Sequence, residues 1–186
     1  AIEPVQVHAP LFLMYVLLLV FTYKWHIKPR FIWAALIGFV IGLTTIMRPT
    51  ELIMILIPIL WNTHTKKDAH FKWLRVKANL PQLFLLVVIA FLAALPQIIY
   101  WKYVTGHFIY QMASAWDFLT PHFRVLLGFE KGWFIYTPIT IFFIWGMFKL
   151  KGYPFRKAVI WFCLINIYII IAWRDWHYGG SYSTRA

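Results

Sequence analysis

The sequence predicts an all-helical, polytopic membrane protein: a bundle of about six transmembrane helices with one long outer loop. Three observations predict this fold class. Of the 186 residues, 62% are hydrophobic and only 13% are charged, whereas soluble domains are about 45–50% apolar and about 25% charged. The apolar residues form long runs, and most basic residues lie in alternate loops between these runs. A soluble domain of this size has too little interior to bury so much apolar surface.

Six apolar runs are the candidate spans. They are residues 10–23, 31–47, 49–61, 81–101, 132–148 and 158–173. A helix crosses a bilayer with about 17–25 apolar residues, so the uncharged run of 21 residues at 81–101 is the strongest candidate. The run at 10–23 can be extended by the snorkelling side chain of Lys24. The 13 residues at 49–61 predict a short or half-inserted helix, or one that extends through the polar residues 62–65.

The loops between the runs alternate in charge. Twelve of the 18 Lys and Arg residues lie in the first, third and fifth loops. The positive-inside rule places these loops in the cytoplasm, and the basic stretch at 71–80 is predicted to be a helix on the inner membrane surface. The net charge of +12 then reflects topology and anionic lipids rather than nucleic acid. Both chain ends lie outside in this arrangement, so we interpret residues 1–186 as one transmembrane domain from the middle of a longer protein.

Glycine and proline patterns inside the runs predict how the helices pack. Gly38 and Gly42 form a GxxxG pattern, which allows two helices to approach closely, and we interpret it as packing within the chain rather than dimerisation. Pro58, Pro96 and Pro138 interrupt runs and are expected to kink their helices.

The first candidate site on the outer side is Arg48, at the end of the second run. Pro49 suits the first position of the next helix. The N-terminus of that helix presents free N–H groups, and Arg48 adds positive charge, so this place predicts an anion site suited to a phosphate. The alternative is an ion pair between Arg48 and Glu51.

The second candidate site is the outer loop at 102–131. Its 30 residues exceed a simple connection, and such loops are usually functional or disordered; the many aromatic residues argue against disorder. Asp117 and Glu130 are candidate general bases, with a solvated or ion-paired carboxylate as the alternative for each. The seven histidines are too scattered to predict a metal site, and no cofactor is implied.

The third candidate site is the segment 173–185, which combines aromatic, basic and glycine residues. Aromatic rings can stack on a sugar, and Arg174 or Arg185 can bind a phosphate with a planar fork. Paired glycines allow another group to approach the backbone closely, and Asp175 is a further candidate carboxylate. The alternative is an aromatic belt at the membrane interface.

With these motifs in their order, the chain resembles the GT-C superfamily of integral-membrane glycosyltransferases, and in particular its protein O-mannosyltransferase and aminoarabinose-transferase branch. Three patterns support the resemblance. They are Gly38, Gly42 and Leu43 followed by Arg48-Pro49-Thr50, the stretch KGWFIYTP at 131–138, and the stretch 173–185 with its tryptophans, its Gly-Gly-Ser and its final arginine.

The resemblance implies transfer of a sugar from a polyprenyl-phosphate donor, with inversion, to an acceptor on the external face of a bacterial inner membrane. It implies donor and membrane lipids as partners. It assigns the lipid phosphate to Arg48, Lys131 and Arg185, and the sugar pocket to Trp173, Trp176 and Tyr178. The catalytic carboxylate of such enzymes lies in the first outer loop, which has no counterpart here, so we expect it upstream of Ala1.

Two other functions remain open at this point. A transporter or lipid-linked sugar flippase usually carries ionisable groups inside its spans, whereas the main polar groups within these runs are Asn166 and Thr44. A non-catalytic subunit of a membrane assembly is the third interpretation. The sequence determines neither the sugar, nor the acceptor, nor the oligomeric state.

Overall fold

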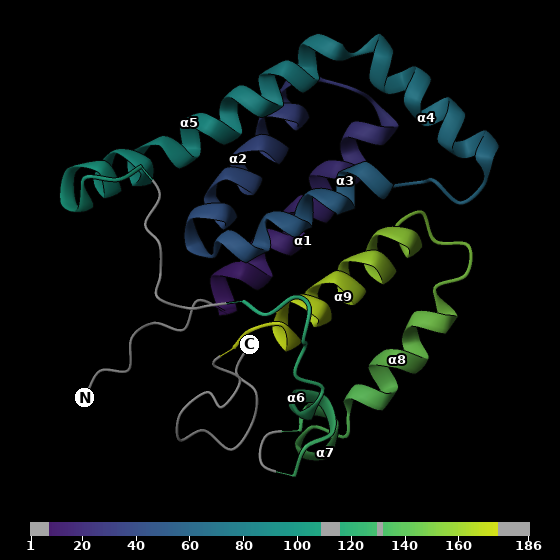
Figure 1. Ribbon diagram of the computed structural model, residues 1–186. Helices are drawn as coiled ribbons and strands as arrows, with labels where there is room; N and C mark the ends of the chain where they lie inside the picture. The colour runs from purple at the N-terminus through teal and green to yellow at the C-terminus, as the bar shows by residue number, and fades with distance from the viewer. Residues whose placement is uncertain (1–7, 109–115, 130–131, 175–186) are drawn as a thin grey trace. The chain divides into compact units, whose positions relative to one another are not determined.

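The computed structural model describes residues 8–108, 116–129 and 132–174 (Figure 1). The regular secondary structure of these ranges is helical, and one isolated β-bridge between Trp116 and Trp173 is its only extended pairing. The all-helical prediction is therefore confirmed. The chain forms two compact units, Ala1–Tyr110 and Gln111–Ala186, and each is described by itself.

The helices follow the predicted apolar runs. The first unit contains α1 (His8–Ile27), α2 (Phe31–Met47), the 3₁₀ helix η1 (Pro49–Ile55), α3 (Leu56–Leu60), α4 (Lys66–Ala78) and α5 (Leu80–Thr105). The second unit contains α6 (Arg124–Leu127), α7 (Trp133–Tyr136), α8 (Thr140–Lys149) and α9 (Arg156–Ile171).

Two helices in the described ranges are long and apolar enough to cross a membrane, Ala9–Ile27 of α1 and Leu80–Thr105, which is α5. At 1.5 Å per residue, α5 is about 39 Å long, compared with about 30 Å for the hydrocarbon core of a bilayer. The segments Phe31–Met47, Pro49–Leu60 and Thr140–Lys149 are apolar but shorter. The count of six spans is therefore not confirmed and stays a prediction.

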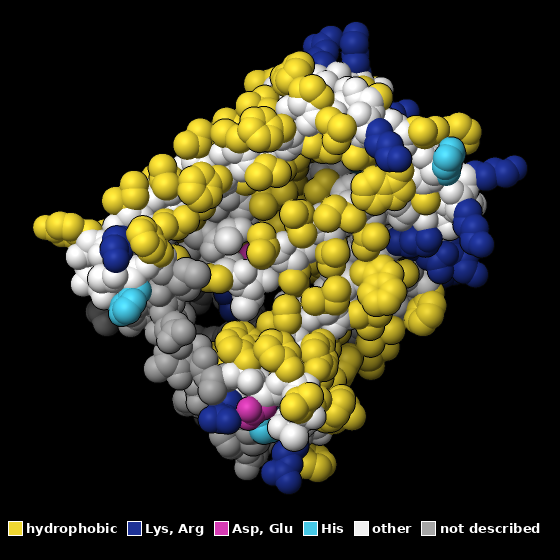
Figure 2. All heavy atoms as spheres, turned by 45° about the horizontal axis from the view of Figure 1, so that its top comes forward, with side chains coloured by type: hydrophobic (Ala, Val, Ile, Leu, Met, Phe, Trp, Pro, Cys, Tyr) yellow, Lys and Arg dark blue, Asp and Glu magenta, His cyan; other side chains and the backbone are white. Residues whose placement is uncertain are grey.

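The apolar surface of α5 is unusually open for a helix of this composition. None of the residues in its most hydrophobic stretch is fully buried, and Phe84, Val87 and Phe91 are 73%, 63% and 57% exposed. Figure 2 shows hydrophobic side chains along the length of this helix. A core helix of a soluble protein buries such residues, whereas a lipid-facing helix exposes them. The exposure of α5 thus indicates a membrane environment.

The predicted run at 132–148 does not form one helix. It is divided into α7 and α8, with Pro138 in the turn between them. Proline has no N–H to donate, and its ring clashes with the preceding helical turn. At Pro138 the helix is therefore interrupted rather than kinked. The hydroxyl of Thr140 donates to the carbonyl of Thr137 at 2.8 Å and holds the start of α8. Helix α5, in contrast, continues through Pro96.

The run at 49–61 also differs from a single α-helix. It begins as η1 and becomes α-helical only at Leu56. Two buried side chains connect this segment to α2: the hydroxyl of Thr44 donates to the sulfur of Met54 at 2.7 Å, and both residues are 0% exposed. The segment is therefore packed within the first unit.

The GxxxG pattern of α2 lies against the backbone of α5. A Cβ atom added to Gly38 would lie 2.2 Å from the carbonyl oxygen of Leu86, and one added to Gly42 would lie 2.4 Å from that of Ala90. Only glycine permits so close an approach of two helices. The prediction of close packing within the chain is confirmed.

Basic side chains of helix α4 donate hydrogen bonds to the ends of two other helices in the first unit. The helix begins at a capping box, in which the side chains of Thr65 and Asp68 each accept a hydrogen bond from the backbone N–H of the other residue. Lys72, only 6% exposed, donates to the carbonyl of Pro58 at 2.7 Å and to that of Ile59, and burial lowers its pKa to about 8. Arg75 donates to the carbonyl of His26. Helix α4 thus supplies donors to the C-terminal carbonyls of α3 and α1, where cations are favoured.

Candidate functional site

Arg48 lies in the connection between α2 and η1, in the first unit. Its backbone is extended, and its N–H donates to the carbonyl of Thr44 at 2.9 Å. Its guanidinium lies 3.9 Å from a carboxylate oxygen of Glu51. The other carboxylate oxygen of Glu51 accepts a hydrogen bond from the hydroxyl of Tyr15. The ion pair that the sequence left open as an alternative is therefore present.

This pairing changes what the Arg48 site can offer to an anion. The carboxylate of Glu51 is largely buried, with its side chain 11% exposed, whereas that of Arg48 is 36% exposed. The segment that follows Arg48 is a short 3₁₀ helix rather than an α-helix, so its end carries a smaller dipole than expected. Arg48 keeps an accessible side chain, and its role toward a phosphate stays a prediction.

In the second unit, the outer loop is held against the end of α9 by backbone hydrogen bonds. The N–H of Asp117 donates to the carbonyl of Ala172, and the N–H of His122 donates to that of Ile171, both at 2.7 Å. The hydroxyl of Tyr168 donates to the carbonyl of Phe118. The second and third candidate places of the sequence thus meet at the C-terminal end of α9.

Aromatic rings stack at this junction. The rings of Trp116 and Trp173 are 6.3 Å apart between centroids at 27°, and those of Trp116 and Phe118 are 6.1 Å apart at 10°. Tyr168 lies beside Phe118, at 6.0 Å. We call these four residues the aromatic cluster. The flat apolar faces of these aromatic rings can stack on a sugar ring in the same way as they stack on one another.

A bidentate ion pair completes the junction. Arg174 donates from Nε and from one terminal nitrogen to the two carboxylate oxygens of Asp117, at 3.0 and 3.1 Å. These hydrogen bonds hold the pKa of Asp117 below its ordinary value of 3.8. A carboxylate with a lowered pKa is a poor proton acceptor near neutral pH. Asp117 therefore suits the positioning of Arg174 better than general base catalysis.

This ion pair predicts a pH dependence of stability. Because the pKa of Asp117 is lower in the folded chain than in the unfolded one, its contribution is fully present above about pH 4 and is lost as the pH falls through the folded pKa, below 3.8. The measurement is the difference in free energy of unfolding between the wild type and Asp117→Asn from pH 6 to pH 2. We expect this difference to shrink below pH 4; a constant difference over the range would contradict it.

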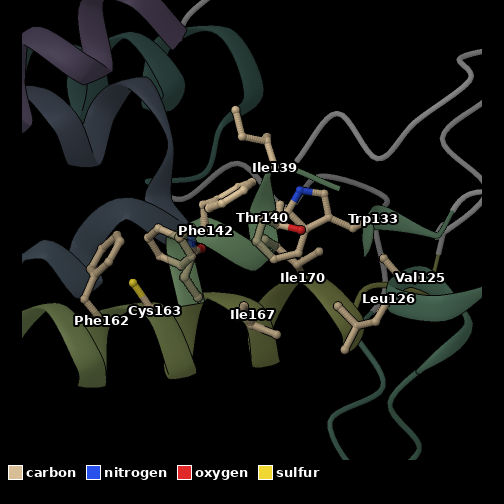
Figure 3. A pocket seen from close by; sticks show the side chains of 12 residues that line it. Val125, Leu126, Trp133, Ile139, Thr140, Phe142, Phe162, Cys163, Ile167 and Ile170 are labelled. Carbon is tan, nitrogen blue, oxygen red and sulfur yellow. The ribbon is translucent and has the colours of Figure 1, made fainter. Parts of the chain in front are cut away.

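The second unit also contains an apolar cavity of about 720 Å³. Figure 3 shows side chains of α8 and α9 lining it, with Trp133 of α7 and two residues of α6. Its wall along α9 extends from Phe162 to Ile170, and Trp173 follows Ile170 within one helical turn. Asn166 and Thr140 are its polar lining residues. Small-molecule sites have volumes of about 300–1,000 Å³, so an apolar ligand or lipid chain fits.

Four of the ten candidate residues lie in the described ranges: Arg48, Asp117, Trp173 and Arg174. The structure brings Asp117, Trp173 and Arg174 together, whereas Arg48 belongs to the first unit. The other six, Lys131, Arg185, Trp176, Tyr178, Glu130 and Asp175, lie outside the described residues. Among the described side chains, no group of three or more His, Cys, Asp or Glu residues is placed to hold a metal ion.

The chain matches no protein-family model, no curated protein and no solved structure. Its function must therefore be argued from its own residues.

Sequence reasoning did not find the partner of Asp117, the stacking of Trp116 on Trp173, or the cavity. One signal was present in the sequence: Trp116-Asp117 and Trp173-Arg174 are two Trp-charge pairs of opposite sign.

Proposed function

We propose that this chain belongs to an integral-membrane glycosyltransferase that takes a sugar from a polyprenyl-phosphate donor and transfers it, with inversion, to an acceptor outside the cytoplasm. The observation that carries the proposal is that the second unit contains both an aromatic cluster and an apolar cavity. A lipid-linked sugar has a sugar ring that suits the first feature and a hydrocarbon chain that suits the second, with a phosphate between them.

Each part of such a donor has a chemically suitable counterpart. The cavity between α8 and α9 has room for part of a prenyl chain. Trp173 offers a ring face to the sugar, together with Trp176 and Tyr178 in the proposed site. Two donors of Arg174 are engaged by Asp117, so we assign the phosphate to Arg48, Lys131 and Arg185. Their charge would stabilise the lipid phosphate as it leaves.

The proposed topology has six spans in a bacterial inner membrane, with the basic loops in the cytoplasm. Arg48, the loop at 102–131 and the segment after the last span then share the external side, because each of them follows an even-numbered span. The lipid-exposed character of α5 supports a membrane location.

The test is transfer of mannose or aminoarabinose from its polyprenyl-phosphate donor by the intact protein in proteoliposomes. Arg48→Gln and Arg185→Gln are each expected to lower turnover or donor affinity by about 100-fold, the usual cost of losing one group that stabilises developing negative charge. If the double alanine variant transferred sugar at the wild-type rate, the phosphate assignment would be wrong.

A matched control separates phosphate binding from the structural role of Arg48. Glu51→Gln removes the ion pair of Arg48 but keeps the guanidinium. We expect Glu51→Gln to retain most of the transfer activity. An equal loss in Glu51→Gln and Arg48→Gln would assign Arg48 to structure only.

The runner-up function is a lipid-linked sugar flippase, because the same apolar cavity and basic residues suit translocation of the donor. The same proteoliposomes distinguish the two functions. A flippase would move the donor between leaflets without forming a product, whereas a non-catalytic subunit would do neither alone.

A further inference from the structure

Helix α4 has two different faces, and only one of them is used within the first unit. The inward face carries Lys72, whose ammonium group is buried against the end of α3. The outward face is formed by residues spaced at 4, 7, 8 and 11 positions from Lys66, which lie on one side of a helix. These are His70, Trp73, Leu74 and Lys77, all of them exposed.

Large apolar side chains are interleaved with lysines on this surface. Phe71 is 68% exposed, and Trp73 and Leu74 are 49% exposed. Lys66 and Lys67 are exposed beside them. Figure 2 shows blue and yellow side chains gathered together over α4. We call the exposed side chains of residues 66, 67, 70, 71, 73, 74 and 77 the outer face of α4.

The position of α4 along the chain restricts what this face can meet. A single residue, Asn79, separates α4 from α5, and α5 is the longest helix in the described ranges that could cross a membrane. The outer face of α4 therefore lies within a few residues of the point where α5 would enter the bilayer. Arg75 and Lys72 hold α4 against the ends of α1 and α3, so α4 cannot move far from that point.

We propose that the outer face of α4 binds anionic phospholipid headgroups at the membrane surface where α5 begins. The charges are complementary: Lys66, Lys67 and Lys77 carry positive charge, and the lipid phosphates carry negative charge. Lysines next to a membrane helix each contribute about a fivefold gain in attraction to an anionic surface.

The aromatic and aliphatic side chains favour a lipid surface over other acidic partners. A nucleic acid or an acidic protein would satisfy the lysines but would leave Phe71 and Leu74 in water. At a bilayer interface, rings and aliphatic chains enter the boundary between headgroups and acyl chains while the lysines stay at the phosphates. This inference concerns the end of the first unit and does not depend on the proposed transferase activity.

The experiment uses the full chain with a fluorescent reporter on α4. Cys163→Ala removes the single cysteine, and His70→Cys places an environment-sensitive label, such as NBD, on the outer face. The protein is reconstituted in vesicles of phosphatidylcholine alone or with added phosphatidylglycerol. We expect a blue shift of the emission, and quenching by lipids brominated in their acyl chains, only when phosphatidylglycerol is present.

Charge variants then test which residues are responsible. The triple variant Lys66→Gln, Lys67→Gln and Lys77→Gln should need at least tenfold more phosphatidylglycerol for the same shift, and the corresponding triple arginine variant should need an unchanged amount. A control with the same charge loss elsewhere, Lys28→Gln, Lys149→Gln and Lys151→Gln, should behave as the wild type.

Three results would overturn the proposal. The first is the same emission in both kinds of vesicle. The second is an equal loss in the control triple variant, which would reduce the effect to net charge. The third is a shift that requires an added oligonucleotide or acidic polypeptide instead of phosphatidylglycerol, which would identify a soluble partner.

Discussion

The substitution Gly42→Leu is expected to prevent the packing of α2 against α5. A Cβ atom at Gly42 would already lie 2.4 Å from the carbonyl oxygen of Ala90 and 2.8 Å from the Cβ atom of Ala93. Overpacking of a core costs about 1–3 kcal/mol and occasionally more, and here the obstacle is backbone, which cannot rotate away. We expect a loss at or above the upper end of this range, measured as the free energy of unfolding in detergent.

Gly146 provides the matched control for this substitution. It lies in α8, and an added Cβ atom would meet nothing within 4 Å. Gly146→Leu should therefore be neutral or should stabilise the helix by up to about 1 kcal/mol, because glycine is a poor helix former. Equal destabilisation by the two substitutions would show that the contact between α2 and α5 is not what Gly42 protects.

The substitution Lys72→Glu is expected to detach α4 from the end of α3. The substitution removes the donor to the carbonyls of Pro58 and Ile59 and brings a negative charge to a helix end that already carries a partial negative charge. A hydrogen bond to a charged group contributes about 1.5–3 kcal/mol, so we expect a loss of free energy of unfolding at or above this range. Lys67→Glu, on the exposed first turn of the same helix, should change the free energy of unfolding by less than about 1 kcal/mol.

A pH titration provides a second measurement for Lys72. Its pKa is lowered from 10.5 to about 8 by burial, so between these values the unfolded chain binds a proton that the folded chain does not. The free energy of unfolding of the wild type should therefore rise with pH over this window. This rise should be absent in Lys72→Met; the same rise in both proteins would contradict the assignment to Lys72.

The positions of the helices could be predicted because run length and composition are local properties. The run at 31–47 coincides with α2, and the GxxxG pattern correctly predicted a close internal contact. The break at Pro138 could not be predicted in the same way. Whether a proline bends or ends a helix depends on whether neighbouring groups bind the freed carbonyls, and Pro96 and Pro138 differ in outcome although both interrupt apolar runs.

The sequence predicted which types of residue the candidate site contains, but it did not predict which of their side chains contact each other. The sequence named Asp117 as a carboxylate that is either a base or ion-paired, but Arg174 lies 57 positions away, and only the folding of the outer loop brings them together. The pairing of Glu51 with Arg48 could be predicted from the sequence because the two residues are only three positions apart. The cavity depends on how α8 and α9 pack around it, and the spacing of apolar residues along the chain does not predict that packing.

The backbone bonds that join the outer loop to α9 have a consequence for biosynthesis. The backbone N–H groups of Asp117 and His122 donate to the carbonyls of Ala172 and Ile171, so the aromatic cluster cannot be completed while the ribosome is still making α8. The nascent chain must therefore hold Trp116 and Phe118 without Trp173 and Tyr168 until about fifty further residues have been synthesised. The synthesis of α9 is therefore the step that completes the aromatic cluster of the second unit.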